Sequence, residues 1–318
     1  MPSSSPLSGK LVTVFGGSGF FGTHVAQALL SRGARLRIAA RHPEAAFSLK
    51  PLANLGQLQF ARCNVLDERS VRACVQGADV VVNLVGSFEG NLMKLMGEAA
   101  GTIARAAADE GAGAMVQVSA IGADPDSPTQ YAQAKALGEK LVSDAFPGAT
   151  ILRPSIIFGE DDNFLNMFAG LIRMMPALPV FGPESELQLV HVDDCAEAVA
   201  IAAENPAKFG GKTYELGGPE KLTMLEINER IAAAQRRRRS FIPMPDALSG
   251  AFAALPGTPM GTDQWTLLKQ GSTVSGDLPG FKAFGIEPAP LGLYLDRWMT
   301  RYRKHGRFSE KLASAGKS

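Results

Sequence analysis

The sequence predicts an α/β protein: a Rossmann-type doubly wound parallel sheet with a smaller, discontinuous C-terminal lobe. A glycine-rich turn follows the first apolar segment, and strand-like and helix-like segments then alternate through the first half of the 318-residue chain. This alternation is typical of a parallel sheet with helices on both faces. Such sheets bind ligands at the carboxyl ends of their strands, so residues at those ends are the first candidates for a site.

The first strand and helix are expected on either side of the turn. Residues 12–15 are apolar, and the turn after them has the spacing Gly-x-x-Gly-x-x-Gly. Gly16 allows a backbone conformation that a side chain resists, Gly19 lets a pyrophosphate approach the main chain, and Gly22 lets the next helix lie close to the strand. The helix expected over residues 20–30 points its free N–H groups at the phosphates. A plain strand-to-helix connection is the alternative. The cofactor contacts predicted here are Gly16, Ser18, Gly19, Phe20, Phe21 and Gly22.

The second strand, expected over residues 36–40, ends at the position that selects the cofactor. Enzymes that prefer NAD place Asp or Glu about 20 residues beyond the turn, where the carboxylate accepts hydrogen bonds from ribose hydroxyls. This sequence has Ala40 and Arg41 instead. A guanidinium can bind a 2′-phosphate through paired hydrogen bonds, whereas a carboxylate would repel it. Arg41 therefore predicts NADP(H), the alternative being a solvated residue at a strand end.

The rest of the first half fits the same sheet. Residues 78–86 form an almost wholly apolar run between glycines, the pattern of a strand buried on both faces. The expected strand ends direct attention to Gly86 and its neighbours, to Ser119, and to the turn after Pro154. The other elements expected in this half are strands over residues 58–63 and 114–119 and helices over residues 70–76 and 92–110.

A second chemical signal is Tyr131-Ala-Gln-Ala-Lys135, on a helix that follows the fifth strand. Residues four apart share one helix face, so the phenol and the ammonium are expected side by side. A nearby ammonium stabilises a phenolate and makes Tyr131 a candidate acid or base. Lys135 would also donate to the nicotinamide ribose. Chance occurrence of Tyr-x-x-x-Lys is the alternative.

Together these motifs resemble the short-chain dehydrogenase/reductases of the extended or atypical type. The resemblance implies cofactor contacts beyond the glycine turn, and Tyr131, Lys135 and Ser119 as the catalytic group. Two positions depart from the family. Asn64 stands where the family usually has Asp against the adenine, and Ala120 and Ile121 occupy the places of the third catalytic hydroxyl. The added cofactor contacts are Asn64, Val65, Leu84, Val85, Gly86, Tyr131, Lys135, Pro154, Ile156 and Ile157.

The C-terminal half is similar to one branch of that family, the nucleotide-binding accessory subunit of respiratory complex I and its bacterial relatives. The similar segments are residues 146–159, 160–166 and 278–288. This resemblance implies a complex I-associated accessory or assembly protein that holds NADPH as a structural ligand. An active NADPH-dependent reductase or epimerase using Tyr131 and Lys135, on an unknown substrate, is the alternative. Whether the protein is an enzyme therefore stays open at this point.

The chain is expected to divide into two parts. Residues 1–158, with returning segments at about 184–218, are expected to form the NADP(H)-binding domain. Residues 159–183 and 219–318 are expected to form the smaller lobe for substrate or partner. His191 is expected to be structural, at the junction of a strand with a helix, and Arg236 to Arg239 are expected to neutralise a helix end.

Composition limits the partners and the compartment. The chain has 32 Lys and Arg against 31 Asp and Glu, so no global field attracts nucleic acid. Its three cysteines show no metal spacing and leave one thiol unpaired in any disulfide scheme, which predicts inert thiols, no metal and a reducing compartment. No apolar run approaches the roughly 20 residues that span a bilayer. A cytoplasmic protein is expected, either free or peripheral on the cytoplasmic face of the inner membrane.

The last expected helix carries the membrane alternative. Its apolar residues fall on one face over residues 291–302, and five basic residues occupy the rest and the tail. Such a helix can lie on an anionic membrane, dock on a partner, or pack on its own lobe. The basic residues are Arg297, Arg301, Arg303, Lys304 and Arg307.

Overall fold

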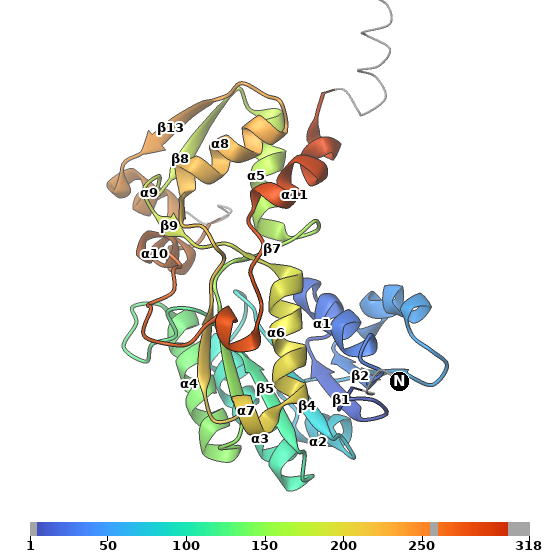
Figure 1. Cartoon of the computed structure of the whole chain (residues 1–318). Coiled ribbons are helices and arrows are strands. Elements are labelled where there is room, and N and C mark those ends of the chain that lie inside the picture. The colour runs from blue at the N-terminus through green and yellow to red at the C-terminus, as the bar shows by residue number, and fades with distance from the viewer. Residues whose placement is uncertain (1–4, 255–259, 305–318) are drawn as a thin grey trace, which may run out of the picture. The chain divides into compact units, whose positions relative to one another are not determined.

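The structure is a computed structural model that describes residues 5–254 and 260–304, and its chain divides into two compact units (Figure 1). Of the described residues, the first unit comprises 5–155, 192–217 and 274–288, and the second comprises 156–191, 218–254, 260–273 and 289–304. None of the helices in the described part of the chain has both the length and the apolar composition needed to cross a bilayer.

The first unit is a seven-stranded, wholly parallel sheet in the order β11-β6-β5-β4-β1-β2-β3. The fold class is therefore confirmed. Its strands are β1 (Leu11–Phe15), β2 (Arg35–Ala40), β3 (Leu58–Arg62), β4 (Val80–Asn83), β5 (Ala114–Val118), β6 (Thr150–Pro154) and β11 (Thr213–Leu216).

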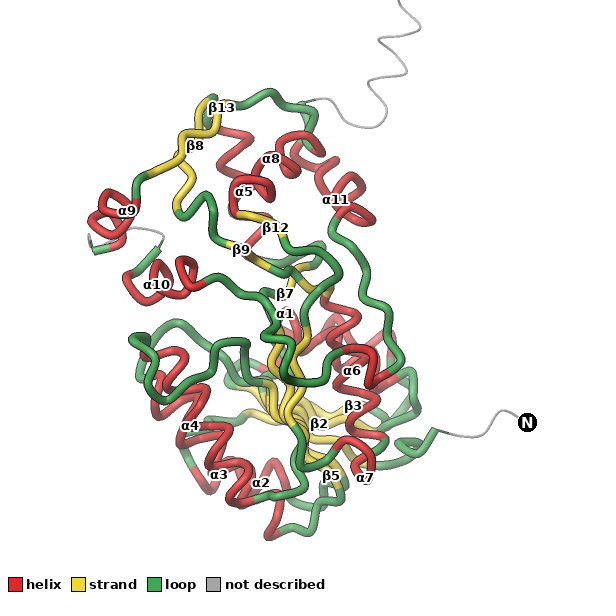
Figure 2. The backbone as a smooth tube through the Cα atoms, turned by 60° about the vertical axis from the view of Figure 1, so that its left-hand side comes forward, coloured by secondary structure: helices red, strands yellow, loops and turns green. Residues whose placement is uncertain are grey.

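Helices cover both faces of this sheet (Figure 2). On one face α1 packs on α6, and on the other α2 packs on α3 and α3 on α4. Small residues permit the tight helix packing. A Cβ added to Gly138 would lie 2.4 Å from the Met96 carbonyl oxygen, for example. The helices are α1 (Phe20–Leu30), η1 (Pro43–Leu52), α2 (Glu68–Val75), η2 (Met93–Glu98), α3 (Ala99–Asp109), α4 (Gln130–Ala145), α6 (Val192–Glu204), α7 (Pro206–Phe209) and η3 (Phe281–Phe284).

Two expected elements of this unit differ in detail. The strand expected over residues 78–86 ends at Asn83, and the Asn83 side chain accepts a hydrogen bond from Val85 N–H just beyond that end. The helix expected over residues 92–110 begins with the π-helical turn η2 before α3. Single π-helical turns inside helices are frequent at functional sites.

The second unit has its own apolar core, built around Phe158, Leu165, Ile227 and Trp298. Its strands pair two by two: β10 with β7, β12 with β9, and β13 with β8. Its elements are β7 (Ile157–Phe158), α5 (Asn163–Met174), β8 (Ala177–Phe181), β9 (Glu186–Leu187), β10 (Val190–His191), β12 (Leu222–Thr223), α8 (Met224–Ala234), β13 (Ser240–Met244), α9 (Asp246–Ala253), α10 (Thr262–Gln270), α11 (Gly292–Trp298) and η4 (Met299–Tyr302).

The division into units differs from the expected one in three places. Residues 156–158, which were expected in the NADP(H)-binding domain, belong to the second unit. Residues 184–191 belong to the second unit, where β9 and β10 pair with β12 and β7. Residues 274–288 belong to the first, because Glu215 N–H donates to the Pro279 carbonyl and the Phe284 ring stacks on Phe209 with centroids 4.6 Å apart.

The last helix packs its apolar face inside the second unit. Leu291, Leu295, Trp298 and Met299 are all buried in the core of that unit. Of the basic residues, Arg301 pairs with Glu160 and Asp161 of the same unit, and Arg303 donates to the Ala234 carbonyl. Arg307 lies outside the described residues. Among the three expected uses of this helix, these contacts support packing on its own lobe.

Candidate functional site

A cavity of about 420 Å³ lies at the carboxyl ends of four neighbouring strands in the first unit. Its walls come from the segments that follow β1, β2, β3 and β4, which meet where the strand order reverses around β1. This is where doubly wound sheets bind dinucleotides. The lining residues are Gly16, Ser18, Gly19, Phe20, Phe21, Gly22, Ala39, Ala40, Arg41, His42, Cys63, Asn64, Val65, Leu66, Leu84, Val85, Gly86 and Leu95.

The three glycines of the turn each meet a different steric demand. Gly16 has φ +76°, and an added Cβ would lie 3.2 Å from the Leu84 carbonyl carbon. A Cβ on Gly22 would lie 2.4 Å from the Gly16 carbonyl oxygen, so only glycine lets α1 approach the turn. At Gly19 an added Cβ would meet a single atom of the described chain within 4 Å, the Gly16 carbonyl oxygen at 3.5 Å. The protein itself therefore leaves room at Gly19 that a side chain would fill.

The same turn is the amino end of α1. Gly19 is the N-cap, and no side chain within the described ranges caps the first turn. Unpaired N–H groups at a helix N-terminus attract phosphate oxygens. Ser18, Phe20 and Phe21 line the cavity beside them. This geometry is the one expected of a pyrophosphate site.

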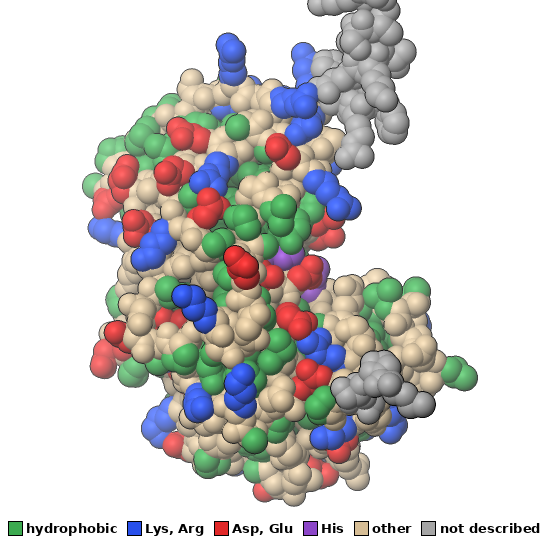
Figure 3. Space-filling model, viewed as in Figure 1, with side chains coloured by type: hydrophobic (Ala, Val, Ile, Leu, Met, Phe, Trp, Pro, Cys, Tyr) green, Lys and Arg blue, Asp and Glu red, His purple; other side chains and the backbone are tan. Residues whose placement is uncertain are grey.

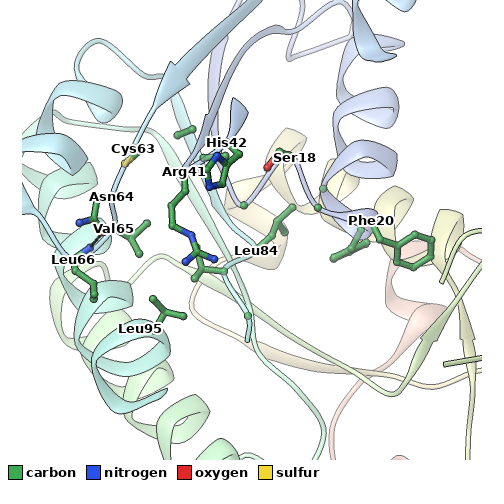
Figure 4. A pocket seen from close by; sticks show the side chains of 18 residues that line it. Ser18, Phe20, Arg41, His42, Cys63, Asn64, Val65, Leu66, Leu84 and Leu95 are labelled. Atoms are coloured by element: carbon green, nitrogen blue, oxygen red, sulfur yellow. Dashed lines mark hydrogen bonds between the residues drawn. The ribbon is translucent and has the colours of Figure 1, made fainter. Parts of the chain in front are cut away.

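Arg41 and Asn64 face the other end of the cavity. Figure 4 shows the Arg41 side chain extending into the space bordered by Val65, Leu84 and Leu95, with Phe20 at the far end. The Asn64 side-chain oxygen accepts from Leu66 N–H at 3.1 Å, which leaves its amide nitrogen to donate to a ligand. The cavity thus has a guanidinium and an amide at the end where the adenosine half of a dinucleotide would lie.

Several residues that line the cavity are not among the predicted contacts. His42 and Cys63 adjoin predicted contacts along the chain, so their proximity was the available signal. Leu66 directly follows the predicted contact Val65. Leu95 lies in the π-helical turn η2, and the sequence pattern did not predict that turn. Leu66 and Leu95 add apolar surface to the wall that faces Arg41 in Figure 4.

Tyr131 and Lys135 lie on one face of α4, as their spacing predicted. The Lys135 ammonium lies 5.9 Å from the centroid of the Tyr131 ring and donates to the carbonyls of Val118 and Val85, at 3.3 and 3.5 Å. Val85 lines the cavity, and a Cβ on Gly86 would lie 3.8 Å from the ammonium nitrogen. Lys135 therefore borders the cavity without being part of its wall.

Burial shifts both groups away from charge. Burial lowers the pKa of Lys135 to about 8, against an opposing pull from the carboxylate of Glu139. Burial alone raises the pKa of Tyr131 to about 12. Phe88 contributes to that burial, because its ring stacks on Tyr131 with centroids 4.6 Å apart. At neutral pH the phenol is protonated and one of its ring faces is covered.

Ser119 follows directly after β5 and is 3% exposed. Its hydroxyl has no hydrogen-bond partner among the residues that the structure describes. Beside it, Gln117 accepts a hydrogen bond from the Asn83 amide at 2.8 Å and donates to the Val118 carbonyl. Ala120 and Ile121 carry no hydroxyl, so the Ser119 hydroxyl is the one that this strand end supplies.

The remaining predicted residues fall into both units. Pro154 ends β6 in the first unit, whereas Ile156 and Ile157 belong to the second. His191 is 3% exposed, and its ring stacks on Tyr294 with centroids 4.1 Å apart and planes inclined by 8°. Within the described ranges, no group of three or more His, Cys, Asp and Glu side chains is arranged to hold a metal ion.

Residues 12–217 match the model of the NAD dependent epimerase/dehydratase family. The chain belongs to this family. The match spans β1 through β11, so it includes every segment that lines the cavity together with Tyr131 and Lys135.

Two relatives that match nearly the whole chain indicate a narrower group of proteins than the family model does. The chain is 32% identical over 327 residues to the mitochondrial NADH dehydrogenase [ubiquinone] 1 alpha subcomplex subunit 9 of Arabidopsis thaliana, covering 95% of this chain and 80% of that protein. The subunit of the same name from Rattus norvegicus is 31% identical, with 97% and 84% covered. The predicted similarity to a complex I accessory subunit within a dehydrogenase-type family is thus confirmed.

Solved structures share the fold of this epimerase family member. The NADPH-dependent quinone oxidoreductase QOR2 of Escherichia coli, solved in complex with NADPH, superimposes with a TM-score of 0.72 at 18% identity. The superposition covers 90% of this chain and 99% of that one. At this identity the likeness concerns the fold alone.

Proposed function

We propose that the protein binds NADP(H) in the cavity at the ends of β1 to β4 and retains it as a structural ligand. The observation that carries this proposal is the open space at Gly19 in front of the uncapped amino end of α1. A pyrophosphate in that space would accept hydrogen bonds from the first-turn N–H groups. A ligand that binds only the folded protein stabilises it by mass action, without being consumed.

Arg41 supports NADP(H) over NAD(H). It lines the cavity immediately after β2, where a carboxylate would receive the ribose hydroxyls of NAD. The neighbouring His42 also lines the cavity, and its ring contacts the carboxylate of Glu44 at 3.3 Å. A 2′-phosphate at this end would pair with the Arg41 guanidinium.

Retention rather than turnover is supported by the surroundings of Tyr131. A proton donor or acceptor works best with a pKa near the operating pH, and burial moves the pKa of Tyr131 to about 12. Phe88 covers one face of the phenol ring. Bound NADPH would supply a hydride to a substrate. The third hydroxyl of the family's catalytic group, however, is missing from its usual place, and the hydroxyl available at this strand end is that of Ser119, earlier in the chain.

The second candidate function is an NADPH-dependent reductase or epimerase. The shared face of Tyr131 and Lys135 beside the cavity favours it. In that case Lys135 would hold the nicotinamide ribose, and Tyr131 would donate a proton to the substrate once Phe88 moved from its ring. The substrate of such a reaction is not defined by these residues.

The relatives suggest the setting for the first candidate. Both of the relatives described above are named as subunits of NADH dehydrogenase [ubiquinone]. We infer that this protein associates with subunits of respiratory complex I as an accessory or assembly protein, at the cytoplasmic face of the inner membrane. The viewed face interleaves Lys and Arg with Asp and Glu (Figure 3), which favours a protein partner over a uniformly anionic surface.

The test begins with the purified protein. Denaturation should release NADP(H), identified by mass and absorbance, and Arg41→Ala should weaken NADPH binding far more than NADH binding. Arg35→Ala, at the other end of β2, is the matched control and should change neither. Absence of nucleotide, together with no thermal shift on adding NADPH, would overturn the proposal.

Two further measurements separate the candidates. If the Tyr131→Phe protein keeps NADPH and still supports complex I assembly, the function is retention of the cofactor. If this variant keeps NADPH but no longer supports assembly, Tyr131 takes part in a reaction.

Direct attachment to a membrane is tested by cosedimentation of the full chain with anionic vesicles. Attachment through charge predicts binding that weakens as the salt concentration rises.

A further inference from the structure

A second cavity, of about 580 Å³, is lined by residues of the second unit alone. Its walls come from the last turns of α8 and from the segment that leads into β13. We call it the arginine cavity, because the four consecutive arginines Arg236 to Arg239 line it together with Glu229 and Phe241. Among the described residues that line it, four positive charges thus face a single carboxylate, an arrangement that attracts an anion.

Backbone carbonyls hold two of the four arginines in place. Arg239 Nε donates to the Ile172 carbonyl at 2.7 Å, and Arg237 Nη2 donates to the Tyr302 carbonyl at 3.1 Å. Carbonyl oxygens satisfy these donors without neutralising the charge of the guanidinium groups. The Arg237 Nε atom is buried and has no hydrogen-bond partner among the residues that the structure describes. A buried donor without an acceptor is costly, and a ligand that supplies the acceptor removes that cost.

Arg236 has a backbone conformation that usually belongs to glycine. It directly follows Gln235, the C-cap of α8, and its φ is +56°. Its N–H donates to the Ala233 carbonyl, and Arg237 N–H donates to the Ala232 carbonyl. These two bonds define a helix-ending motif in which glycine commonly occupies the left-handed position. A side chain there adds strain, and such strain is typical of positions where the side chain has a function.

Neutralising the end of α8, the role expected for these arginines, does not account for their number. A helix end carries about half a negative charge. Arg303 already donates to the Ala234 carbonyl at that end, at 2.9 Å. Arg237 and Arg239 donate to carbonyls of other segments instead. The arginine cavity therefore holds more positive charge than the helix end can balance.

We propose that the arginine cavity binds an organic phosphate, with its phosphate on Arg236, Arg237 and Arg238 and its organic group against Phe241. Guanidinium groups match phosphate oxygens with paired, charge-assisted hydrogen bonds. Arg236 and Arg238 are exposed and accessible to such a ligand, whereas Phe241 is half-buried against the core of the second unit and gives the cavity an aromatic wall. This proposal does not depend on the binding of NADP(H) in the first unit.

The experiment titrates the full-length protein with phenyl phosphate by calorimetry, with inorganic phosphate as the comparison. Phenyl phosphate should bind once per chain and more tightly than inorganic phosphate, because its ring can contact Phe241. Arg238→Gln should weaken this binding about tenfold, because a charge-assisted hydrogen bond is lost. Arg297→Gln, which removes an exposed arginine of α11 outside the arginine cavity, is the matched control and should bind like the wild type.

Gly19→Ala separates this site from the cavity of the first unit. Its Cβ would fill the space proposed for a pyrophosphate there, so it should leave the binding of phenyl phosphate unchanged. Loss of binding in Gly19→Ala but not in Arg238→Gln would overturn the proposal. A wild-type protein that binds phenyl phosphate but not NADPH would contradict the proposed function and support the arginine cavity.

Arg236→Gly should change stability and binding in opposite directions. Glycine relieves the left-handed conformation, so Tm should rise by about 2 °C, while the affinity for phenyl phosphate should fall about tenfold. No binding of phenyl phosphate to the wild type would overturn the proposal. So would wild-type affinity in both Arg236→Gly and Arg238→Gln.

Vesicles identify the source of the phosphate ester. Cosedimentation compares vesicles that contain phosphatidic acid with vesicles of phosphatidylcholine alone. Binding only to the former, abolished by Arg238→Gln, would assign the site to a lipid headgroup. Binding of phenyl phosphate without binding to either kind of vesicle would assign it to a soluble organic phosphate.

Discussion

The ring of Phe88 lies on the ring of Tyr131, with centroids 4.6 Å apart and planes inclined by 15°. Phe88 is 55% exposed, so it covers the phenol while facing solvent itself. Burial is the cause of the raised pKa of Tyr131. Phe88→Ala should therefore lower that pKa from about 12 toward the ordinary value of about 10. Ultraviolet titration of the phenolate measures it, with Tyr131→Phe identifying which transition belongs to Tyr131. An unchanged transition would show that α4 and the sheet alone bury the phenol.

The glycine turn offers two substitutions with opposite consequences. Gly19→Ala should lower the ligand-free stability by only about 1 kcal/mol, the cost of alanine at an N-cap, because the φ of −80° and ψ of 173° suit alanine and its Cβ has room. It should nevertheless abolish nucleotide binding by filling the space of the pyrophosphate. Gly22→Ala should lower stability by roughly 2 kcal/mol, because its Cβ would overlap backbone atoms. Urea unfolding and nucleotide titration of both variants test the pair. Tight binding by Gly19→Ala would contradict the site.

The buried ammonium of Lys135 should make stability rise with pH. Burial lowers the pKa of Lys135 from 10.5 to about 8 in the folded chain. Between those values the unfolded chain holds a proton that the folded chain lacks, so the free energy of unfolding increases by up to about 1.4 kcal/mol per pH unit. Other groups titrate there too, so the measured quantity is the difference between wild type and Lys135→Met across that window. A difference that is flat with pH would contradict the burial argument.

His191 should be required for stability and not for the cavity. Its ring stacks on Tyr294 at 4.1 Å and lies 5.4 Å from Phe158, inside the core of the second unit. His191→Ala should lower the free energy of unfolding by about 3 kcal/mol. NADPH should bind with unchanged affinity to the folded variant, since the cavity belongs to the first unit. His191→Phe keeps a stacked ring and should lose less stability; a loss of NADPH affinity in either variant would assign His191 a role at the site.

The elements that could be predicted are those defined by local signals, namely the periodicity of their apolar residues and the glycines at their ends. Helix α1 spans residues 20–30 as expected, because Gly19 and Gly33 bracket one apolar-faced segment. The buried strands β4 and β5 were evident from their apolar runs. Arg41 and Asn64 line the cavity because the parallel sheet brings successive strand ends to one edge, which the alternating pattern already implied.

What escaped prediction depends on contacts between distant residues. The π-helical turn η2 has the composition of an ordinary helix, and the tight approach of Gly138 to Met96 is visible only in three dimensions. Phe88 lies in a loop, where nothing in the local pattern places its ring on Tyr131. Cys63 and Cys74 look unrelated along the chain, yet both lie in one buried apolar cluster of the first unit.

The edge strand β11 has a consequence for biosynthesis. It joins β6 only after the chain has left the first unit at residue 155 and returned to it at 192, and residues 274–288 then complete that unit through the stack of Phe284 on Phe209. A nascent chain that stops after β6 would expose that strand's unpaired N–H and C=O groups, which invite aggregation. The nucleotide-binding unit therefore cannot be completed on the ribosome before nearly the whole chain has been translated. Shielding by a chaperone during synthesis would serve this protein more than it would one whose units follow each other in sequence.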